Sequence, residues 1–336
     1  MSLFKFIANK DQKPIRIDKF LIQSIPNISR NQIQKSTHSG KILVNQRIIK
    51  KNNYKIKPFD IVIAETISTP VLDLEYRNII EEKIPINILY EDEDIIVINK
   101  PAGMVVHPGF GHKKGTLIHG IKYHLKNFSH QKKFPPRLGL IHRIDKDTSG
   151  LLLIAKNESS QKGLFQQFFY KTIKRKYIAL VWGTLQKEKG SITGFIGRDP
   201  KNRKRMILFQ TPSKGKYSIT HYKVLEKFQN ITYISCHLET GKTHQIRAHF
   251  KYLGNPLFND STYGGNQILM KKKFSKKNIE FFNKCLKILQ RQALHAICLS
   301  FIHPNNKKKY HFTCPIPEDF QNVLQQCKKQ QLLEKN

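Results

Sequence analysis

The sequence predicts an α+β protein in two parts, a small helix–helix–hairpin unit and a larger domain with a mixed, mainly antiparallel sheet. The first 64 residues contain two apolar patterns with helical spacing, followed by short strands. An acidic stretch with Thr69-Pro70 near its start indicates a linker, and beyond Ile86 short apolar runs alternate with Pro- and Gly-containing turns. The predicted boundaries are 1–68 for the first domain, 69–85 for the linker, 86–325 for the second domain and 326–336 for a frayed tail.

The first unit opens with two predicted helices. Ile17, Leu21 and Ile25 have helical spacing, and Pro26 ends that helix. Ser29 begins the second helix as the N-cap of a capping box.

A hairpin completes the unit. Gly40 closes the second helix, and strands are predicted over 42–44, 47–49 and 56–64. The polar faces carry five cations, which are the candidate contacts to a polyanion: Arg16, Lys19, Arg30, Lys35 and Lys41. A basic helical pair that only packs on the next domain is the alternative.

The stretch 139–150 organises the larger domain. It contains four charged residues within five positions, followed by Thr148-Ser149-Gly150, whose side chains favour a turn. The apolar run 151–155 predicts a strand buried on both faces. Asp145 is therefore expected on a tight turn at the floor of a cleft, with Arg143 and Lys146 beside it. The alternative is an Asp that caps a turn and pairs with a neighbouring Arg.

Two segments further along the chain supply further candidates. The strand 174–183 begins with Lys174-Arg175-Lys176 and carries Tyr177 at its mouth, where the alternative is a core tyrosine. Residues 195–220 predict an exposed basic hairpin that holds phosphates, with Arg203 among its cations.

The segment 239–249 predicts a helix capped by Thr243, with Ile246, Phe250 and Leu253 inward. Arg247 lies beside this apolar stripe, and a partly buried Arg needs a carboxylate. His244 and His249 diverge on such a helix, so no metal site is predicted.

Composition indicates a partner class. The 336 residues include 59 Lys+Arg against 24 Asp+Glu, a net charge of +35, which attracts polyanions such as RNA. Codon bias in an A/T-rich genome is the alternative source of part of this charge. Five scattered cysteines indicate no disulfide framework, and no apolar run is long enough to span a membrane. A cytoplasmic location is expected, because no signal peptide is recognisable.

Residues 15–64 resemble the S4 RNA-binding domain. The resemblance rests on Arg16-x-Asp18-Lys19-Phe20-Leu21, Ser29-Arg30, Gly40 and Val44-Asn45. The sequence departs from that pattern at Phe59, where the family usually has Gly before Asp60.

The larger domain resembles the RluA/RluD-type RNA pseudouridine synthases. Four motifs occur in family order: Asn99-Lys100-Pro101-x-Gly103, His142-Arg143-Ile144-Asp145 with Thr148-Ser149-Gly150, Gly241-Lys242-Thr243-His244-Gln245-Ile246-Arg247, and Arg291-Gln292-Ala293-Leu294-His295-Ala296. The resemblance implies that Asp145 is catalytic, that Arg247 pairs with it, and that Tyr177 stacks on the target uracil. Arg143 is the candidate to fill the space that the flipped base vacates, and Lys242 replaces an Arg in a phosphate contact.

The implied reaction is the isomerisation of uridine in RNA to pseudouridine, and it requires no cofactor. The expected substrate is large-subunit ribosomal RNA. One carboxylate among cations suits a nucleophile or base but not the two-carboxylate hydrolysis of glycosides. The sequence does not choose between attack on the sugar or the base and removal of a sugar proton. The alternatives are a transfer-RNA pseudouridine synthase and an inactive RNA-binding or ribosome-assembly factor. A monomer without an obligate protein partner is expected.

Overall fold

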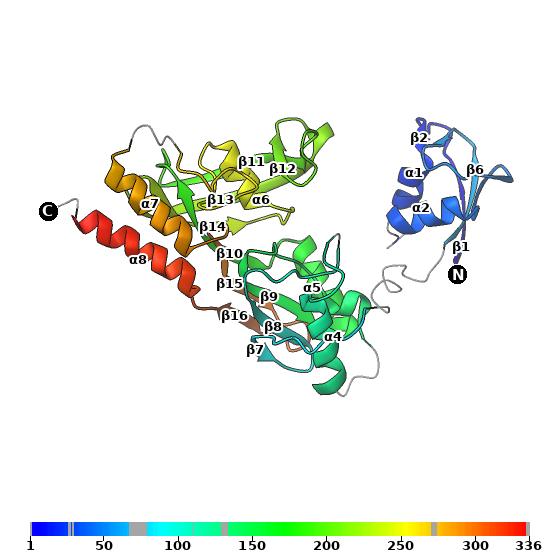
Figure 1. Ribbon diagram of the computed structural model, residues 1–336. Coiled ribbons are helices and arrows are strands. Elements are labelled where there is room, and N and C mark those ends of the chain that lie inside the picture. Colours follow the sequence, from blue (N-terminus) through cyan, green and yellow to red (C-terminus); the bar gives the residue numbers. More distant parts are fainter. Residues whose placement is uncertain are drawn as a thin grey trace. The chain divides into compact units, whose positions relative to one another are not determined.

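A computed structural model describes residues 2–25, 28, 30–66, 79–109, 111–128, 134–269 and 274–333. The chain divides into two compact units, residues 1–79 and 80–336 (Figure 1). Each unit has its own hydrophobic core and is described by itself.

The N-terminal unit packs two helices against a small sheet. Helices α1 (Ile17–Ser24) and α2 (Arg30–His38) accompany a four-stranded antiparallel sheet of order β1-β6-β3-β4. Its strands are β1 (Ser2–Ile7), β3 (Ile42–Val44), β4 (Arg47–Ile48) and β6 (Ile61–Thr66), while β2 (Ile15–Arg16) pairs separately with β5 (Lys55–Ile56). Ile17, Leu21, Ile33 and Val62 lie in the core.

Two details of this unit differ from the sequence prediction. Strand β1, which pairs along the whole of β6, was not predicted, although four of its six residues are apolar. The strand expected over 56–64 is split into β5 and β6 by a turn in which Phe59 has φ 63°. Phe59 thus adopts the left-handed conformation that a Gly would favour. The proposed cap at Ser29 lies outside the described residues.

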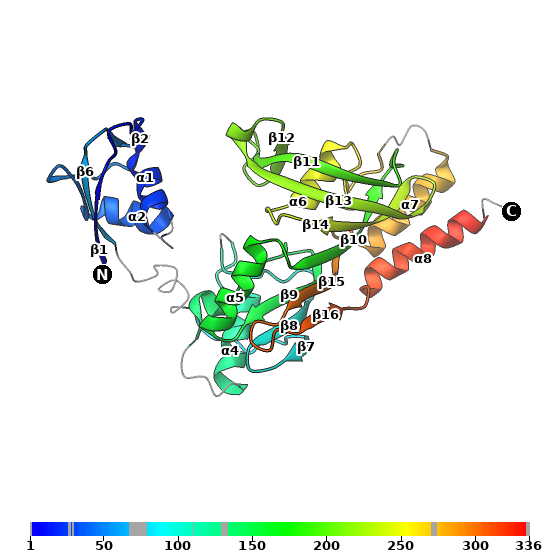
Figure 2. The same cartoon turned by 180° about the vertical axis from the view of Figure 1, so that it is seen from behind.

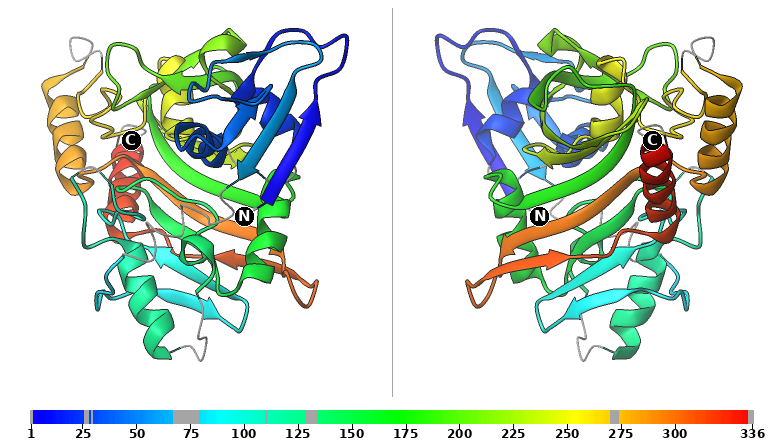
Figure 3. Two further views of the ribbon diagram at one scale, coloured as in Figure 1. Left: turned by 90° about the vertical axis from the view of Figure 1, so that its right-hand side faces the viewer. Right: turned by 90° about the vertical axis from the view of Figure 1, so that its left-hand side faces the viewer.

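The larger unit is built on one ten-stranded sheet. Its order is β12-β11-β13-β14-β10-β15-β9-β8-β7, with β16 paired to β15. Only β15 and β9 run parallel, so the sheet is mixed and mainly antiparallel, as predicted. The side views in Figure 3 show its strong twist. The strands are β7 (Ile88–Glu91), β8 (Ile95–Lys100), β9 (Ser149–Ala155), β10 (Lys174–Trp182), β11 (Lys189–Arg198), β12 (Met206–Phe209), β13 (Lys216–Lys227), β14 (Ile231–Leu238), β15 (Leu294–Ile302) and β16 (Lys309–Thr313).

Helices cover this sheet in two groups. Helices α4 (Leu117–Phe128) and α5 (Glu158–Phe169) lie near β8 and β9, and α7 (Lys276–Ile288) and α8 (Glu318–Leu333) lie side by side at the other end (Figures 1 and 2). Helix α6 (Gln245–Tyr252) contacts β11, β12 and β13. No helix in these described ranges is long and apolar enough to cross a membrane.

The C-terminal end corrects a prediction. The tail was expected to fray from residue 326, but α8 continues to Leu333, and residues 334–336 lie outside the described part. Phe320, Val323 and Cys327 are buried in a core that they share with α7 and β10. A helix with one narrow apolar stripe was overlooked because Lys and Gln dominate its sequence.

Asn157 caps α5, and its side chain accepts a hydrogen bond from the Ser160 backbone N–H. The predicted start of α6 was misplaced. The residue before α6 is His244 with φ 53°, so Thr243 is not the cap, and Leu253 is exposed instead of inward.

Candidate active site

A cavity of about 550 Å³ opens in the larger unit. Its lining comes from the stretch before β9, the end of α5, the start of β10 and the segment between β14 and α6. Asp145, Arg143, Tyr177, Lys242 and Arg247 all line it, although they are far apart in the sequence.

Asp145 stands on a turn immediately before the fully buried strand β9. The Thr148 backbone N–H donates to the Asp145 carbonyl at 3.2 Å, which closes the turn. The turn therefore spans 145–148, and Ser149-Gly150, predicted as turn residues, begin the strand. Gly150 has φ 111°, and a Cβ there would lie 2.3 Å from the Ala296 carbonyl oxygen. Only glycine lets β9 approach β15 this closely.

Arg247 holds the Asp145 carboxylate from the first turn of α6. Its Nη1 donates to Asp145 Oδ2 at 2.9 Å, while Nε and Nη2 donate to the two Asp260 oxygens at 2.7 and 2.9 Å. Burial alone lowers the pKa of Arg247, but the hydrogen bonds and charges of Asp260 and Asp145 outweigh burial and raise it. One guanidinium therefore joins a half-buried carboxylate to a fully buried one.

Sequence reasoning missed Asp260 and His244. Asp260 accepts the Thr262 and Tyr263 backbone N–H groups in addition to Arg247. His244 Nε2 lies 3.9 Å from Asp145 Oδ2. Burial lowers the pKa of His244, and the charge of Asp145 opposes that effect. The need of a buried Arg for a carboxylate was the available signal, but it did not indicate which carboxylate.

Two cations also bind the backbone of the Asp145 turn. Lys100 is fully buried, and its Nζ donates to the carbonyls of Pro101, Met104 and Lys146 at 2.7 to 2.9 Å. Burial lowers the pKa of Lys100 to about 7, whereas Asp147 and Asp145 favour its charged form. Three carbonyl bonds use all three N–H groups of an ammonium, so this geometry belongs to the protonated form.

Arg291 adds a second backbone attachment to the same turn. Its Nη1 donates to the Asp147 carbonyl at 3.2 Å, and its Nε and Nη2 bind Asp319 at the start of α8 at 2.6 and 2.9 Å. The backbone that follows Asp145 is thus held by two cations, Lys100 at the Lys146 carbonyl and Arg291 at the Asp147 carbonyl.

Tyr177 lies on β10 and is 6% exposed. Burial raises the pKa of its hydroxyl, so the side chain is uncharged. Arg143 is exposed beside Asp145, and Lys242 is half-buried on the opposite segment. These placements bring the Asp145 carboxylate, the Tyr177 ring and several cations to the lining of one cavity.

The other predicted RNA contacts lie elsewhere. Arg203 is exposed in the loop between β11 and β12. In the N-terminal unit Lys19 and Lys35 are exposed, Arg16 pairs with Asp18 at 2.8 Å, and Lys41 pairs with Glu65 at 2.7 Å. The side chain of Arg30 lies outside the described residues.

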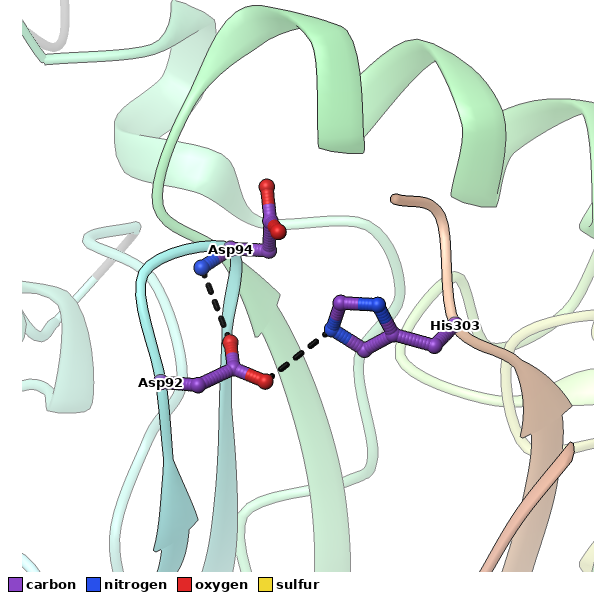
Figure 4. A group of neighbouring side chains, drawn as sticks. All are labelled: Asp92, Asp94 and His303. Atoms are coloured by element: carbon purple, nitrogen blue, oxygen red, sulfur yellow. Dashed lines mark hydrogen bonds and ion pairs between the residues drawn. The ribbon is translucent and has the colours of Figure 1, made fainter. Parts of the chain in front are cut away.

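One cluster away from the cavity has metal-ligand residue types. Asp92, Asp94 and His303 lie together between the β7–β8 turn and the chain after β15 (Figure 4). His303 Nδ1 accepts the N–H groups of Asn305 and Asn306, so its proton sits on Nε2, which donates to Asp92 at 3.0 Å. The ring has no free lone pair, and this cluster is a hydrogen-bonded connection between loops.

Comparison with known proteins agrees with this geometry. The RNA pseudouridylate synthase family profile matches residues 94–252, and the S4 domain profile matches residues 15–62. An uncharacterized RNA pseudouridine synthase of Bacillus subtilis is 41% identical over 98% of this chain and 99% of its own length. The ribosomal large subunit pseudouridine synthase D of Buchnera aphidicola is 40% identical over 92% of this chain and 93% of its own length.

A solved structure shares the fold. The human RNA pseudouridylate synthase domain containing 4 has a TM-score of 0.57 and 22% identity, over 72% of this chain and 93% of that one. The small unit matches an S4 domain, the larger unit matches the synthase fold, and relatives of near-equal length are about two-fifths identical. The chain therefore belongs to the RNA pseudouridine synthases, enzymes that isomerise uridine in RNA to pseudouridine.

Proposed function

We propose that this synthase modifies uridines of large-subunit ribosomal RNA, with Asp145 as the nucleophile and the target base flipped into the cavity. The observation that carries the proposal is the Asp145 carboxylate on the cavity lining, hydrogen-bonded by Arg247 at 2.9 Å. The ribosomal substrate is supported by relatives named ribosomal large subunit pseudouridine synthase D in two organisms.

The isomerisation needs no other reactant. The bond between uracil N1 and ribose C1′ breaks, the uracil turns, and a bond between C5 and C1′ forms as the C5 proton leaves and N1 gains one. Asp145 attacks and later departs, so it is regenerated in each cycle. The anchored backbone of the turn fixes its position through Lys100 and Arg291, which lowers the cost of orientation.

Base flipping follows from the depth of the site. A uridine inside a duplex cannot reach a carboxylate on a cavity lining, and extrusion costs a few kcal/mol. Tyr177 offers a ring for the extruded uracil, and stacking on an aromatic ring is worth about 1–3 kcal/mol. Arg143, exposed on the same lining, is the side chain proposed to occupy the space left in the RNA.

The RNA beyond the target is assigned to basic surfaces. The S4 unit contributes exposed Lys19 and Lys35, and the β11–β12 loop contributes Arg203. We place phosphate contacts there because Lys and Arg neutralise backbone charge without reading sequence.

The test is a pseudouridine map of ribosomal and transfer RNA from cells lacking this protein. The expected result is loss of pseudouridine from large-subunit RNA, restored by the wild type and not by Asp145→Asn. Asp147→Asn is the matched control from the same turn and should restore most modification. Loss of transfer-RNA sites alone would overturn the substrate assignment, and restoration by Asp145→Asn would overturn the nucleophile.

A further inference from the structure

Two buried N–H donors at one corner of the cavity have no hydrogen-bond partner in the described part of the chain. They are Nε of Arg175 and Nδ1 of His142. Both residues line the cavity, and both contact the ring of Phe168: the guanidinium carbon of Arg175 and the imidazole centroid of His142 are each 5.1 Å from its centroid. Buried donors without partners are rare in native proteins, so such a pair calls for an explanation.

Arg175 is the more informative of the two. No carboxylate among the described residues pairs with its guanidinium, and burial lowers its pKa. The guanidinium lies against Gly241, where a Cβ would be 2.6 Å from Nη1. A desolvated Arg is usually paired with an acid because the uncompensated charge is costly. The described residues therefore leave the Arg175 guanidinium without a counter-anion.

His142 presents a neutral donor to the same corner. The Leu153 backbone N–H donates to its Nε2 at 3.0 Å, so the ring proton sits on Nδ1. Burial, with a contribution from the charge of Arg175, lowers the pKa of His142 to about 3. The imidazole is therefore uncharged at neutral pH and has one N–H without an acceptor.

The surroundings contain excess positive charge. Lys171, Arg175 and Lys242 line the same cavity. Burial lowers the pKa of Lys242, and the charges of Lys216, Arg175 and Lys171 lower it further. Glu239 is the acid of this corner, and it is already bound to Lys171 at 3.5 Å and to His221 at 2.7 Å. A mutually repelling set of cations on the wall of an RNA site suits a phosphate.

We infer that Arg175, with His142 and Lys242 in the same corner, binds the backbone phosphate directly attached to the uridine that Tyr177 holds. Arg175 and Tyr177 both line the cavity, and they are two residues apart on β10, about 6–7 Å along the strand. That spacing matches the reach from a nucleobase to its own backbone. This assignment rests on the proposed role of Tyr177, and it adds a subsite that fixes the flipped nucleotide by its phosphate.

The experiment compares three small probes with the full-length protein: uridine, uridine 5′-monophosphate and uridine 3′-monophosphate. Titration calorimetry or ligand-observed NMR gives each Kd at one fixed salt concentration. One nucleotide should bind the wild type roughly tenfold or more tightly than uridine, because a charge-assisted contact is worth about 1.5–3 kcal/mol. Whichever nucleotide it is identifies the phosphate as the 5′ or the 3′ one.

Substitutions locate the effect. Arg175→Gln should reduce the nucleotide's advantage over uridine to less than about twofold while uridine itself binds as before. Arg175→Lys keeps the positive charge but loses the planar guanidinium with its paired N–H donors. It should retain part of the nucleotide's advantage over uridine. Lys284→Gln removes an exposed charge on α7 and is the matched control, expected to change nothing.

Two results would overturn the inference: equal affinity of uridine and both nucleotides for the wild type, or an undiminished advantage in Arg175→Gln. If Arg175→Gln does not fold, Lys242→Gln replaces it. An unchanged advantage of the nucleotide over uridine in both Lys242→Gln and Arg175→Lys would then also reject the subsite. Tyr177→Ala should weaken all three probes equally. Failure of that arm alone, with the phosphate advantage intact, counts against the proposed role of Tyr177 and not against the subsite.

Discussion

Replacing Asp260 by Asn should damage this enzyme without touching the reacting groups. Asp260 is fully buried and accepts from Arg247 Nε and Nη2 at 2.7 and 2.9 Å and from two backbone N–H groups at 3.1 and 3.3 Å. An amide in its place turns one acceptor into a donor that faces another donor. It also leaves Arg247 with Asp145 as the sole carboxylate among its hydrogen-bond partners in the described residues.

The magnitude follows from these contacts. Loss of one charge-assisted bond costs about 1.5–3 kcal/mol, and breaking a buried pair completely costs about 3–5 kcal/mol. We therefore expect Asp260→Asn to lower the free energy of unfolding by about 2–4 kcal/mol. Asp145→Asn removes one bond to a carboxylate with 19% exposure while Arg247 keeps Asp260, so its cost should be about 1 kcal/mol.

Turnover should respond as well. Arg247 positions Asp145, and a displacement of about 1 Å at a reacting group costs roughly a hundredfold in rate. Urea unfolding gives the stability, and single-turnover pseudouridine formation gives the rate. Asp319→Asn is the matched control, because Asp319 forms a similar bidentate pair with Arg291 but is 34% exposed. The reasoning is refuted if Asp260→Asn is no less stable than Asp145→Asn, or keeps its turnover within twofold of wild type.

Two further predictions concern the separate unit and acid stability. Deleting residues 1–70 should leave a folded domain that modifies uridine at higher RNA concentration; if the unit neutralises ~4 phosphates, the log–log salt slope of RNA binding becomes shallower by ~3, and identical slopes would show that it does not touch RNA. Burial lowers the pKa of His249 to about 4 from an ordinary value near 6.5. Between those pH values the unfolded chain binds the proton and the folded protein does not, so stability falls by up to ~3 kcal/mol as pH drops from 6.5 to 4. His249→Gln should flatten that dependence in urea titrations, and an unchanged pH profile would contradict it.

The sequence alone determined the elements whose signal is local. The unbroken apolar run 151–155 predicts a strand buried on both faces, and β9 is one. Turn residues ahead of it indicated where Asp145 stands, and the stripe beside Arg247 indicated that this Arg is buried and needs an acid. The spacing of apolar residues indicates which side of a helix or strand is buried. That local pattern was sufficient to predict the buried strand and the buried Arg247.

Only the tertiary structure decided most of the contacts between distant groups. The family resemblance implied that Arg247 pairs with Asp145, 102 positions away, but no spacing rule selects Asp260, 13 positions away, as its second carboxylate. The same holds for the parallel pairing of β9 with β15 and for Nε of Arg175, which has no hydrogen-bond partner in the described residues. Ion pairs and strand pairings depend on where the chain turns back on itself in three dimensions. The order of apolar and polar residues indicates which side chains are buried, but it does not indicate which residues contact each other.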